Sequence, residues 1–221
     1  MIHLSKIVKW AATLVIPLVA YGYGSEAFRL VKLTSLRSQR LQWFLFGVTL
    51  FTIIWVFLRH RMGFIVCLEH EFTHLLVGLL FLKAPHSFYA SREGGGMVRL
   101  QGNNVIIQLA PYYLPTYSYL LLLIGIPFRR DYAPLLLFLL GFTAAYHVLS
   151  TWGEIHSGQS DLQDAGLLYC WIFLPVANLV VFGALWAFVI KDYSGFTSYW
   201  GNGVTEIIKL FDMMIIQLHS M

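Results

Sequence analysis

The chain alternates between long apolar runs and short polar connections. Six apolar runs can be drawn, over about residues 8–23, 41–59, 63–83, 105–126, 133–151 and 167–190. A helix needs roughly 20 residues to cross the hydrocarbon core of a bilayer, and the runs are close to that length. The pattern therefore predicts an all-α polytopic membrane protein with about six transmembrane helices.

The connections between the runs predict further elements. Only residues 59–62 separate the second run from the third, so these two helices should form a tight antiparallel hairpin. Residues 24–40 carry several Lys and Arg side chains on an amphipathic stretch, which is typical of a helix at the membrane surface. Residues 204–218 have charged positions at every third residue along part of their length, which predicts a C-terminal interfacial helix.

The pattern changes between the third and fourth runs. Two short stretches of strand-forming residues, 88–90 and 97–100, flank three consecutive glycines at 94–96. Two strands joined by a glycine-rich turn fit this arrangement better than a helix does. We therefore predict a small membrane-associated β-hairpin.

The composition agrees with a membrane location and excludes other classes of protein. Of the 221 residues, 58% are hydrophobic and 12% are charged, whereas about 25% are charged in a soluble domain. The net charge of +4 comes from basic residues in the connections, which suits contact with the lipid bilayer and not with nucleic acid. We divide the chain into N-terminal helices with their connector (1–62), a core (63–190) and an amphipathic tail (191–221).

The third run contains the pattern His-Glu-x-x-His, formed by His70, Glu71 and His74. Helix residues four apart lie on the same face, so both imidazoles can reach one cation. Zinc binds neutral imidazole and lowers the pKa of a bound water to about 7, while the glutamate accepts the proton. The pattern thus predicts a hydrolase site with one Zn²⁺ per chain. The alternative is a pair of buried, hydrogen-bonded histidines, but titratable groups within a membrane helix are costly and usually functional.

A catalytic zinc needs a third protein ligand and an open position. The connection over residues 154–164 contains His156, Asp161 and Asp164 but no Lys or Arg, so its acidic groups have no obvious local partner. A third ligand from this connection is the favoured interpretation. The alternative for each acidic residue is a solvated loop in which Ser160 or Asp161 caps the following helix.

Two polar residues in later runs are candidates for contacting the metal ligands without binding the metal themselves. His147 lies in the fifth run, where the alternatives are a hydrogen-bonded core histidine, a ligand or a partner of a ligand. Asn178 follows Pro175 in the sixth run, where it can support the site or bond the backbone that the proline leaves unpaired.

Together these residues resemble the site-2 protease family of intramembrane zinc metalloproteases, in a divergent bacterial branch. Three features over residues 63–190 carry the resemblance. The His-Glu-Phe-Thr-His motif lies within an apolar helix and is followed by Leu-Leu-Val-Gly, a strand-like segment follows at 94–104, and Ser160-Asp161-Leu162 precedes another apolar helix.

The resemblance implies that His70, His74 and Asp161 hold zinc and that Glu71 activates water. Better-known members have Leu-Asp-Gly where this chain has Ser-Asp-Leu, which leaves Asp164 as a rival ligand. The strand-like segment resembles a membrane-embedded sheet whose edge pairs with an unwound substrate. Two asparagines at its end, Asn103 and Asn104, can hold the substrate backbone or serve only the hairpin.

The expected function is cleavage of a membrane-spanning or membrane-associated protein by an intramembrane zinc endopeptidase. A bacterial inner membrane is the location that the resemblance implies. A regulatory membrane partner that controls the activity is also compatible with it. One rival is a metal-binding transporter, which would need polar groups spread over several spans. The other is a non-catalytic scaffold that retains the metal site, in which Glu71 would have no role.

Overall fold

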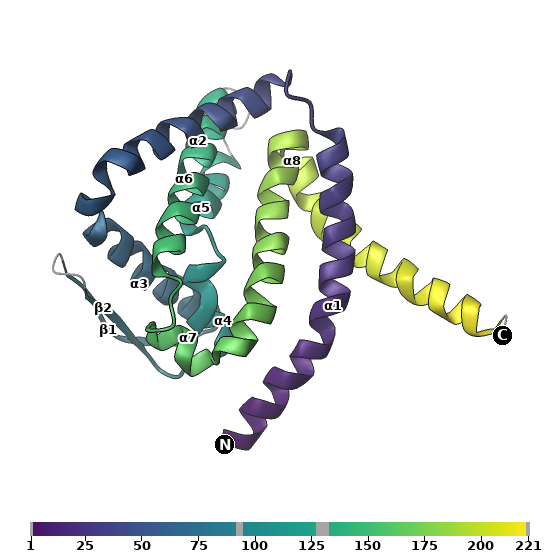
Figure 1. The fold of residues 1–221 in the computed structure, drawn as a ribbon, viewed down its shortest axis with the longest axis horizontal. Coiled ribbons are helices and arrows are strands. Elements are labelled where there is room, and N and C mark those ends of the chain that lie inside the picture. Colours follow the sequence, from purple (N-terminus) through teal and green to yellow (C-terminus); the bar gives the residue numbers. More distant parts are fainter. Residues whose placement is uncertain (1, 92–94, 127–132, 220–221) are drawn as a thin grey trace. The chain divides into compact units, whose positions relative to one another are not determined.

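The computed structural model describes residues 2–91, 95–126 and 133–219 (Figure 1). The chain is predominantly helical and has one small two-stranded sheet. Within the described residues, four helices are long and apolar enough to cross a membrane: Gln39–Arg61, Gly63–Leu80, Ala133–Glu154 and Leu167–Gln217. The structure therefore confirms a predominantly helical fold with a small sheet, and four of the six expected runs meet this criterion for a membrane span.

Contacts between residues divide the chain into two compact units. The terminal unit comprises Met1–Ser38 and Leu168–Met221, and the central unit comprises Gln39–Leu167. The sequence division at residues 62 and 190 follows other boundaries. All the residues that the motif and the later acidic connection contribute belong to the central unit.

In the terminal unit, α1 (Ile2–Leu33) is one continuous helix. The first apolar run and the amphipathic stretch after it were expected as separate elements, but no break separates them. Gly22 lies inside the helix and permits close packing with the last helix of the chain. A Cβ at this position would collide with the carbonyl oxygen of Gly203. The glycines in this part of α1 therefore provide a contact surface and not a helix end.

The last helix of the chain, α8 (Leu167–His219), contains one backbone break. Asp192 has φ of 65° and ψ of −160°, which interrupts the helix. Its carboxylate accepts a hydrogen bond from the backbone N–H of Tyr193 over 2.7 Å, at the start of the second half. The expected C-terminal helix is thus present, and large apolar side chains such as Ile208 and Ile216 are exposed along it.

In the central unit, α2 (Gln39–Leu58) packs closely against α6 (Ala133–Glu154). Two glycines allow this approach: Gly47 faces the backbone of Phe138, and Gly141 faces the backbone of Phe44. Small residues at such positions let membrane helices pack backbone to backbone.

A short 3-10 helix, η1 (Arg59–Arg61), links α2 to α3 (Gly63–Leu80), so the connection is as short as expected. Within the described residues, the two helices do not pack as the expected antiparallel hairpin, because α2 packs against α6 whereas α3 packs against the β-strands and the segment after them. The helix α3 is also joined to α6, because the Tyr146 hydroxyl donates to the carbonyl oxygen of Ile65 over 3.1 Å. These links fix the helix that carries the motif.

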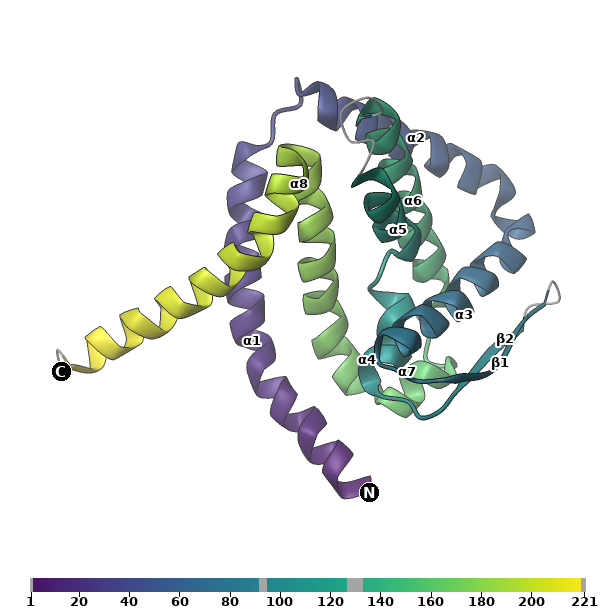
Figure 2. The same cartoon turned by 180° about the vertical axis from the view of Figure 1, so that it is seen from behind.

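The predicted β-hairpin is confirmed. Strands β1 (Pro85–Ala90) and β2 (Gly96–Leu100) are antiparallel, with Phe88 opposite Val98 and Ala90 opposite Gly96. Gly94, which the sequence assigns to the turn, lies outside the described residues. The hairpin lies beside α3 (Figures 1 and 2), and Leu100 packs against Gly78 of that helix.

The fourth apolar run is not a single helix. It consists of α4 (Val105–Leu109), the 3-10 helix η2 (Ala110–Tyr112) and α5 (Thr116–Gly125). Both prolines lack a backbone donor and so cannot make the helical hydrogen bond to the residue four before them, which fits the change to a 3-10 turn at Pro111 and the break before α5 at Pro115. One short helix, α7 (Ser160–Ala165), then precedes α8.

Candidate metal centre

The motif residues lie one turn apart on α3, on the side of the helix that faces α4 and α7. His70 and His74 are both buried, and their ring centroids are 4.9 Å apart. Tyr112 of η2 packs edge-on against the His70 ring, with a centroid distance of 5.4 Å. The expected placement of both imidazoles on one face of the helix is therefore present in the structure.

Asp161 at the start of α7 completes a triangle of ligand atoms with the two histidines. The His70 and His74 Nε2 atoms are 3.2 Å apart. The Asp161 Oδ2 atom lies 3.3 Å from the first and 3.2 Å from the second. Ligands around a tetrahedral zinc, with bonds of about 2.0 Å, are about 3.3 Å from one another. The three atoms thus have the spacing of three corners of a zinc tetrahedron.

The opposite ring nitrogen of each histidine is bonded to an acceptor. His70 Nδ1 donates to Glu154 Oε2 over 2.9 Å, and His74 Nδ1 donates to the carbonyl oxygen of Ile107 over 2.9 Å. Because both partners are acceptors, each neutral histidine carries its proton on Nδ1 and directs its Nε2 lone pair toward Asp161. Three lone pairs then meet at one point, which a proton or a cation must occupy.

This donor set fits zinc. Two imidazoles and one carboxylate are a usual ligand set for a catalytic zinc site, and each imidazole is oriented by an acceptor behind it. Among the described residues, His70, His74 and Asp161 are the group of His, Cys, Asp or Glu side chains close enough together to hold a metal ion. The structure supports the ligand triad, whereas zinc as the metal is a proposal.

The structure separates the two aspartates of α7. Asp161 is half-buried and faces the histidines, while Asp164 is exposed and is not part of the triad. Burial by itself would raise the pKa of Asp161, but the hydrogen bonds that it accepts from His70 and His74 when these rings hold a proton on Nε2 outweigh burial and hold the pKa well below its usual range. The carboxyl group is therefore anionic at neutral pH, which is the form that binds a cation.

Glu154, the last residue of α6, is a site residue that the sequence did not single out. In the sequence, Glu154 is simply the first residue of the connection that contains Asp161. Its half-buried carboxylate instead pairs with His70. An acidic side chain at the end of an apolar helix, in a connection without basic residues, was the available signal.

The two asparagines have different places. Asn104 caps α4, since its Oδ1 accepts from the backbone N–H groups of Ile106 and Ile107 over 3.0 and 2.9 Å. It therefore holds the segment whose carbonyl oxygen orients His74. The Asn103 side chain lines a cavity beside the triad, and its Oδ1 accepts from the Asn104 N–H over 2.9 Å.

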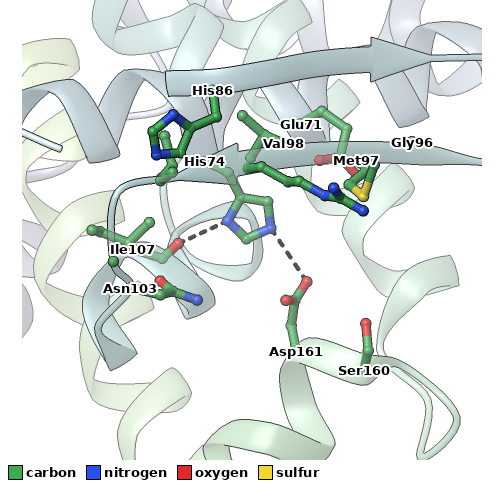
Figure 3. A pocket seen from close by; sticks show the side chains of 13 residues that line it. Glu71, His74, His86, Gly96, Met97, Val98, Asn103, Ile107, Ser160 and Asp161 are labelled. Atoms are coloured by element: carbon green, nitrogen blue, oxygen red, sulfur yellow. Dashed lines mark hydrogen bonds and ion pairs between the residues drawn. The ribbon is translucent and has the colours of Figure 1, made fainter. Parts of the chain in front are cut away.

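This cavity has a volume of about 490 Å³ and opens beside His74 and Asp161 (Figure 3). The residues of β2 form one wall of it, and Glu71 lines it too. The Glu71 side chain lies against Gly96, where an added Cβ would come within 2.5 Å of Glu71 Cγ and 2.6 Å of Cys67 Sγ. A carboxylate therefore stands next to the ligand triad at the start of β2 without belonging to the triad.

His147 and Asn178 do not contribute to the ligand triad. His147 is buried on α6, and its Nδ1 atom is 3.8 Å from Glu69 Oε1, next to a hydrogen bond between Thr73 and Thr116. It is not a member of the triad. Asn178 belongs to the terminal unit, where its Nδ2 donates to the carbonyl oxygen of Leu174 over 2.9 Å.

No protein-family model, curated protein or solved structure matches this chain. The residues of the site and their geometry are therefore the basis for assigning a function. They combine three converging ligand atoms, a neighbouring carboxylate that is not a ligand, and a cavity of about 490 Å³ beside them.

Proposed function

We propose that this protein is an intramembrane zinc metalloprotease, similar to the site-2 protease family, that hydrolyses peptide bonds of membrane-spanning or membrane-associated proteins. The observation that carries this proposal is the convergence of His70, His74 and Asp161 beside a cavity that also holds Glu71. A purely structural metal site would be closed, and a carboxylate that faces the cavity without being a ligand would have no role in it.

Each residue of the site has one role in the reaction. His70, His74 and Asp161 hold the metal. Zinc bound there supplies Lewis acidity and makes water acidic enough to lose a proton near neutral pH. Glu71 accepts that proton and passes it to the leaving amine nitrogen. The water oxygen bonds to the peptide carbonyl carbon, the C–N bond breaks, and the proton ends on the new amine.

The hairpin supports a way of presenting the substrate. One edge of β2 pairs with β1, and residues 96–100 of β2 line the cavity. A transmembrane substrate has its backbone groups bonded within its own helix, so its peptide bonds become accessible only after unwinding. Addition of the unwound segment to the edge of β2 would give its backbone new partners.

Asn103 is placed to assist this binding. Its Oδ1 is engaged by the N–H of Asn104, so its amide nitrogen is left to donate. Figure 3 shows that nitrogen directed toward the space between His74 and Asp161. We therefore assign Asn103 as a donor to a substrate carbonyl oxygen, and Asn104 as a residue that positions the Ile107 carbonyl.

The exposed apolar surface supports a multi-pass location, which we propose to be a bacterial inner membrane. Large apolar side chains such as Phe46, Val56 and Phe57 of α2 are more than half exposed in the isolated chain, as expected for a helix that faces lipid. We propose that α1 and the broken segment α4–α5 also lie within the membrane, which gives six embedded segments. The second half of α8 would lie at the interface.

A cleavage assay with matched zinc determinations tests the function. The protein is purified in detergent through an affinity tag without histidine, and reporter proteins with single transmembrane segments serve as substrates. Wild type should hold zinc and cleave a reporter, while Glu71→Gln should hold zinc and cleave none. Equal cleavage by both forms would contradict the protease assignment. Zinc binding without cleavage by the wild type would favour a scaffold, and zinc uptake into sealed vesicles would favour a transporter.

A further inference from the structure

Three basic residues lie near one another along the chain's path where the open end of the hairpin borders the cavity. Arg99 of β2 and His86 of β1 both line it. Lys83, which follows α3, borders the same end, because a Cβ added to the lining residue Gly102 would lie 3.7 Å from Lys83 Nζ. We call Lys83, His86 and Arg99 the basic end of the cavity.

A bulge in β1 explains why His86 faces this space. Pro85 pairs with Leu100 and Ser87 pairs with Arg99, so His86 is an extra residue between two paired positions. A bulge of this kind interrupts the alternation of side chains and re-aims one of them. Figure 3 shows His86 and Glu71 on opposite sides of His74.

The basic end has no local counter-charge in the part of the chain that the structure describes, where Lys83, His86 and Arg99 form no ion pair. The two carboxylates that line the cavity serve other groups: Asp161 contacts the two histidines, and Glu71 lies against Gly96. Gly96 and Arg99 are three residues apart on one strand, which corresponds to about 10 Å. The backbone of Arg99 and the glycine that Glu71 contacts are therefore at different ends of β2.

Because strands pair residue by residue in a sheet, this positive charge can favour one kind of substrate side chain over another. If a substrate segment adds to the edge of β2, one of its residues lies directly across from Arg99 with its side chain on the same face. Opposite charges across a pair of strands are stabilising, and like charges are destabilising. A substrate side chain at that position thus meets Arg99 directly, while His86 of β1 lies beyond β2, about two strand spacings or roughly 10 Å away.

We propose that the basic end selects substrates with an Asp or Glu side chain within about three residues of the scissile bond. The inference rests on the proposed protease function and names the substrate class of the same site. Basic residues near the ends of membrane helices also contact anionic lipid headgroups. Two of these three line the cavity that contains Glu71, so a peptide side chain is the occupant that the structure favours.

The test begins with an unbiased substrate profile. Zinc-loaded wild type in detergent is incubated with a peptide library made by digesting a bacterial proteome, and the cleaved bonds are identified by mass spectrometry. We expect enrichment of Asp and Glu at one position within about three residues of the cleaved bond. The best peptide is then synthesised with Glu, Gln or Lys at that position. For the wild type, kcat/KM should fall by about two- to fivefold from Glu to Lys, the range for an exposed charge pair.

Charge reversal provides the decisive variant. Arg99→Glu should invert the preference, so that the Lys peptide becomes the better substrate, and Arg99→Lys should keep the wild-type order. Arg61→Glu, an exposed position in η1 that is not part of the cavity, is the matched control and should keep it too. Zinc content of each variant shows that the site is intact, and Arg99→Gln, which should abolish the preference without inverting it, serves if Arg99→Glu fails to fold.

The outcomes separate the two proposals. Failure of zinc-loaded wild type to cleave any peptide or membrane reporter would contradict the protease function itself. Cleavage without acidic enrichment, or an unchanged preference in Arg99→Glu, would overturn only the selection rule. A loss of cleavage in Arg99→Glu that is equal for all peptides and appears only with anionic lipid in the micelles would assign the basic end to lipid, which also overturns the rule.

Discussion

The Nδ1–H group of His70 donates a hydrogen bond to the carboxylate of Glu154 over 2.9 Å. This bond connects the metal-binding face of α3 to the last residue of α6. This contact fixes the ring orientation and leaves Nε2 free to bind the metal. Glu154 is thus a positioning residue for the first ligand, just as the Ile107 carbonyl oxygen is for the second.

Removal of the Glu154 carboxylate should weaken metal binding without removing a ligand. We expect Glu154→Ala to lower zinc affinity by about 10- to 100-fold, the usual cost of losing such a partner. Glu154→Gln keeps an acceptor oxygen and should lose less. Competition with a chromogenic chelator measures both affinities. Equal affinity in Glu154→Ala and the wild type would show that the contact does not orient His70.

The two aspartates of α7 should differ in their effect on the metal. Asp161→Ala removes a ligand and should leave the purified protein with far less than one zinc per chain. Asp164→Ala changes an exposed residue outside the triad and should keep full zinc content. Metal analysis by mass spectrometry after identical purification decides the matter, and the reverse order would transfer the ligand role to Asp164.

Two neighbouring glycines test the position of Glu71. A Cβ at Gly96 would collide with the Glu71 side chain, whereas a Cβ at Gly95 would meet nothing within 4 Å. Gly96→Ala should therefore displace Glu71 and lower kcat by about ten- to a hundredfold. Zinc content should be unchanged, because no ligand moves.

Gly95→Ala is the matched control in the same segment and should keep wild-type kcat. Equal rates for the two variants would mean that the place of Glu71 beside β2 is not needed for cleavage. Loss of zinc from Gly96→Ala would show that the glycine supports the ligands themselves.

The packing of α2 on α6 should depend on Gly141. A side chain there would collide with the backbone of Phe44, so Gly141→Ala should lower the free energy of unfolding by about 1–3 kcal/mol. Gly153, on the same helix, has open space around it. Gly153→Ala should keep or raise stability, because alanine favours a helix more than glycine does. Thermal unfolding in detergent compares the two, and equal melting temperatures would contradict the close approach of the helices.

Local patterns predicted what depends on nearby residues. The spacing of His70, Glu71 and His74 follows from the geometry of one helix, so their common placement could be predicted from the sequence. The hairpin was predictable for the same reason, since strand-forming residues flank a glycine run. The division of the fourth run into separate elements was not predicted: residues 105–126 are one apolar run in the sequence, and the structure has three short elements there, with prolines at 111 and 115.

Long-range contacts were harder to predict. The choice of Asp161 over Asp164 depends on how α7 meets α3, which no local pattern specifies. Glu154 has no motif of its own and acquires its role only from the approach of His70. The pattern predicts that the first apolar run ends near residue 23, but Gly22 is buried against Gly203 and the helix continues to Leu33.

The central claim is that His70, His74 and Asp161 form one zinc site, and X-ray absorption spectroscopy at the zinc edge tests it most directly. The sample is Glu71→Gln, purified without chelators and without a histidine tag, so that the site is intact and self-digestion is prevented. We predict one zinc per chain, two imidazole ligands at about 2.0 Å and otherwise oxygen ligands. Protein without zinc, fewer than two imidazoles, or a sulfur ligand such as Cys67 would contradict the account.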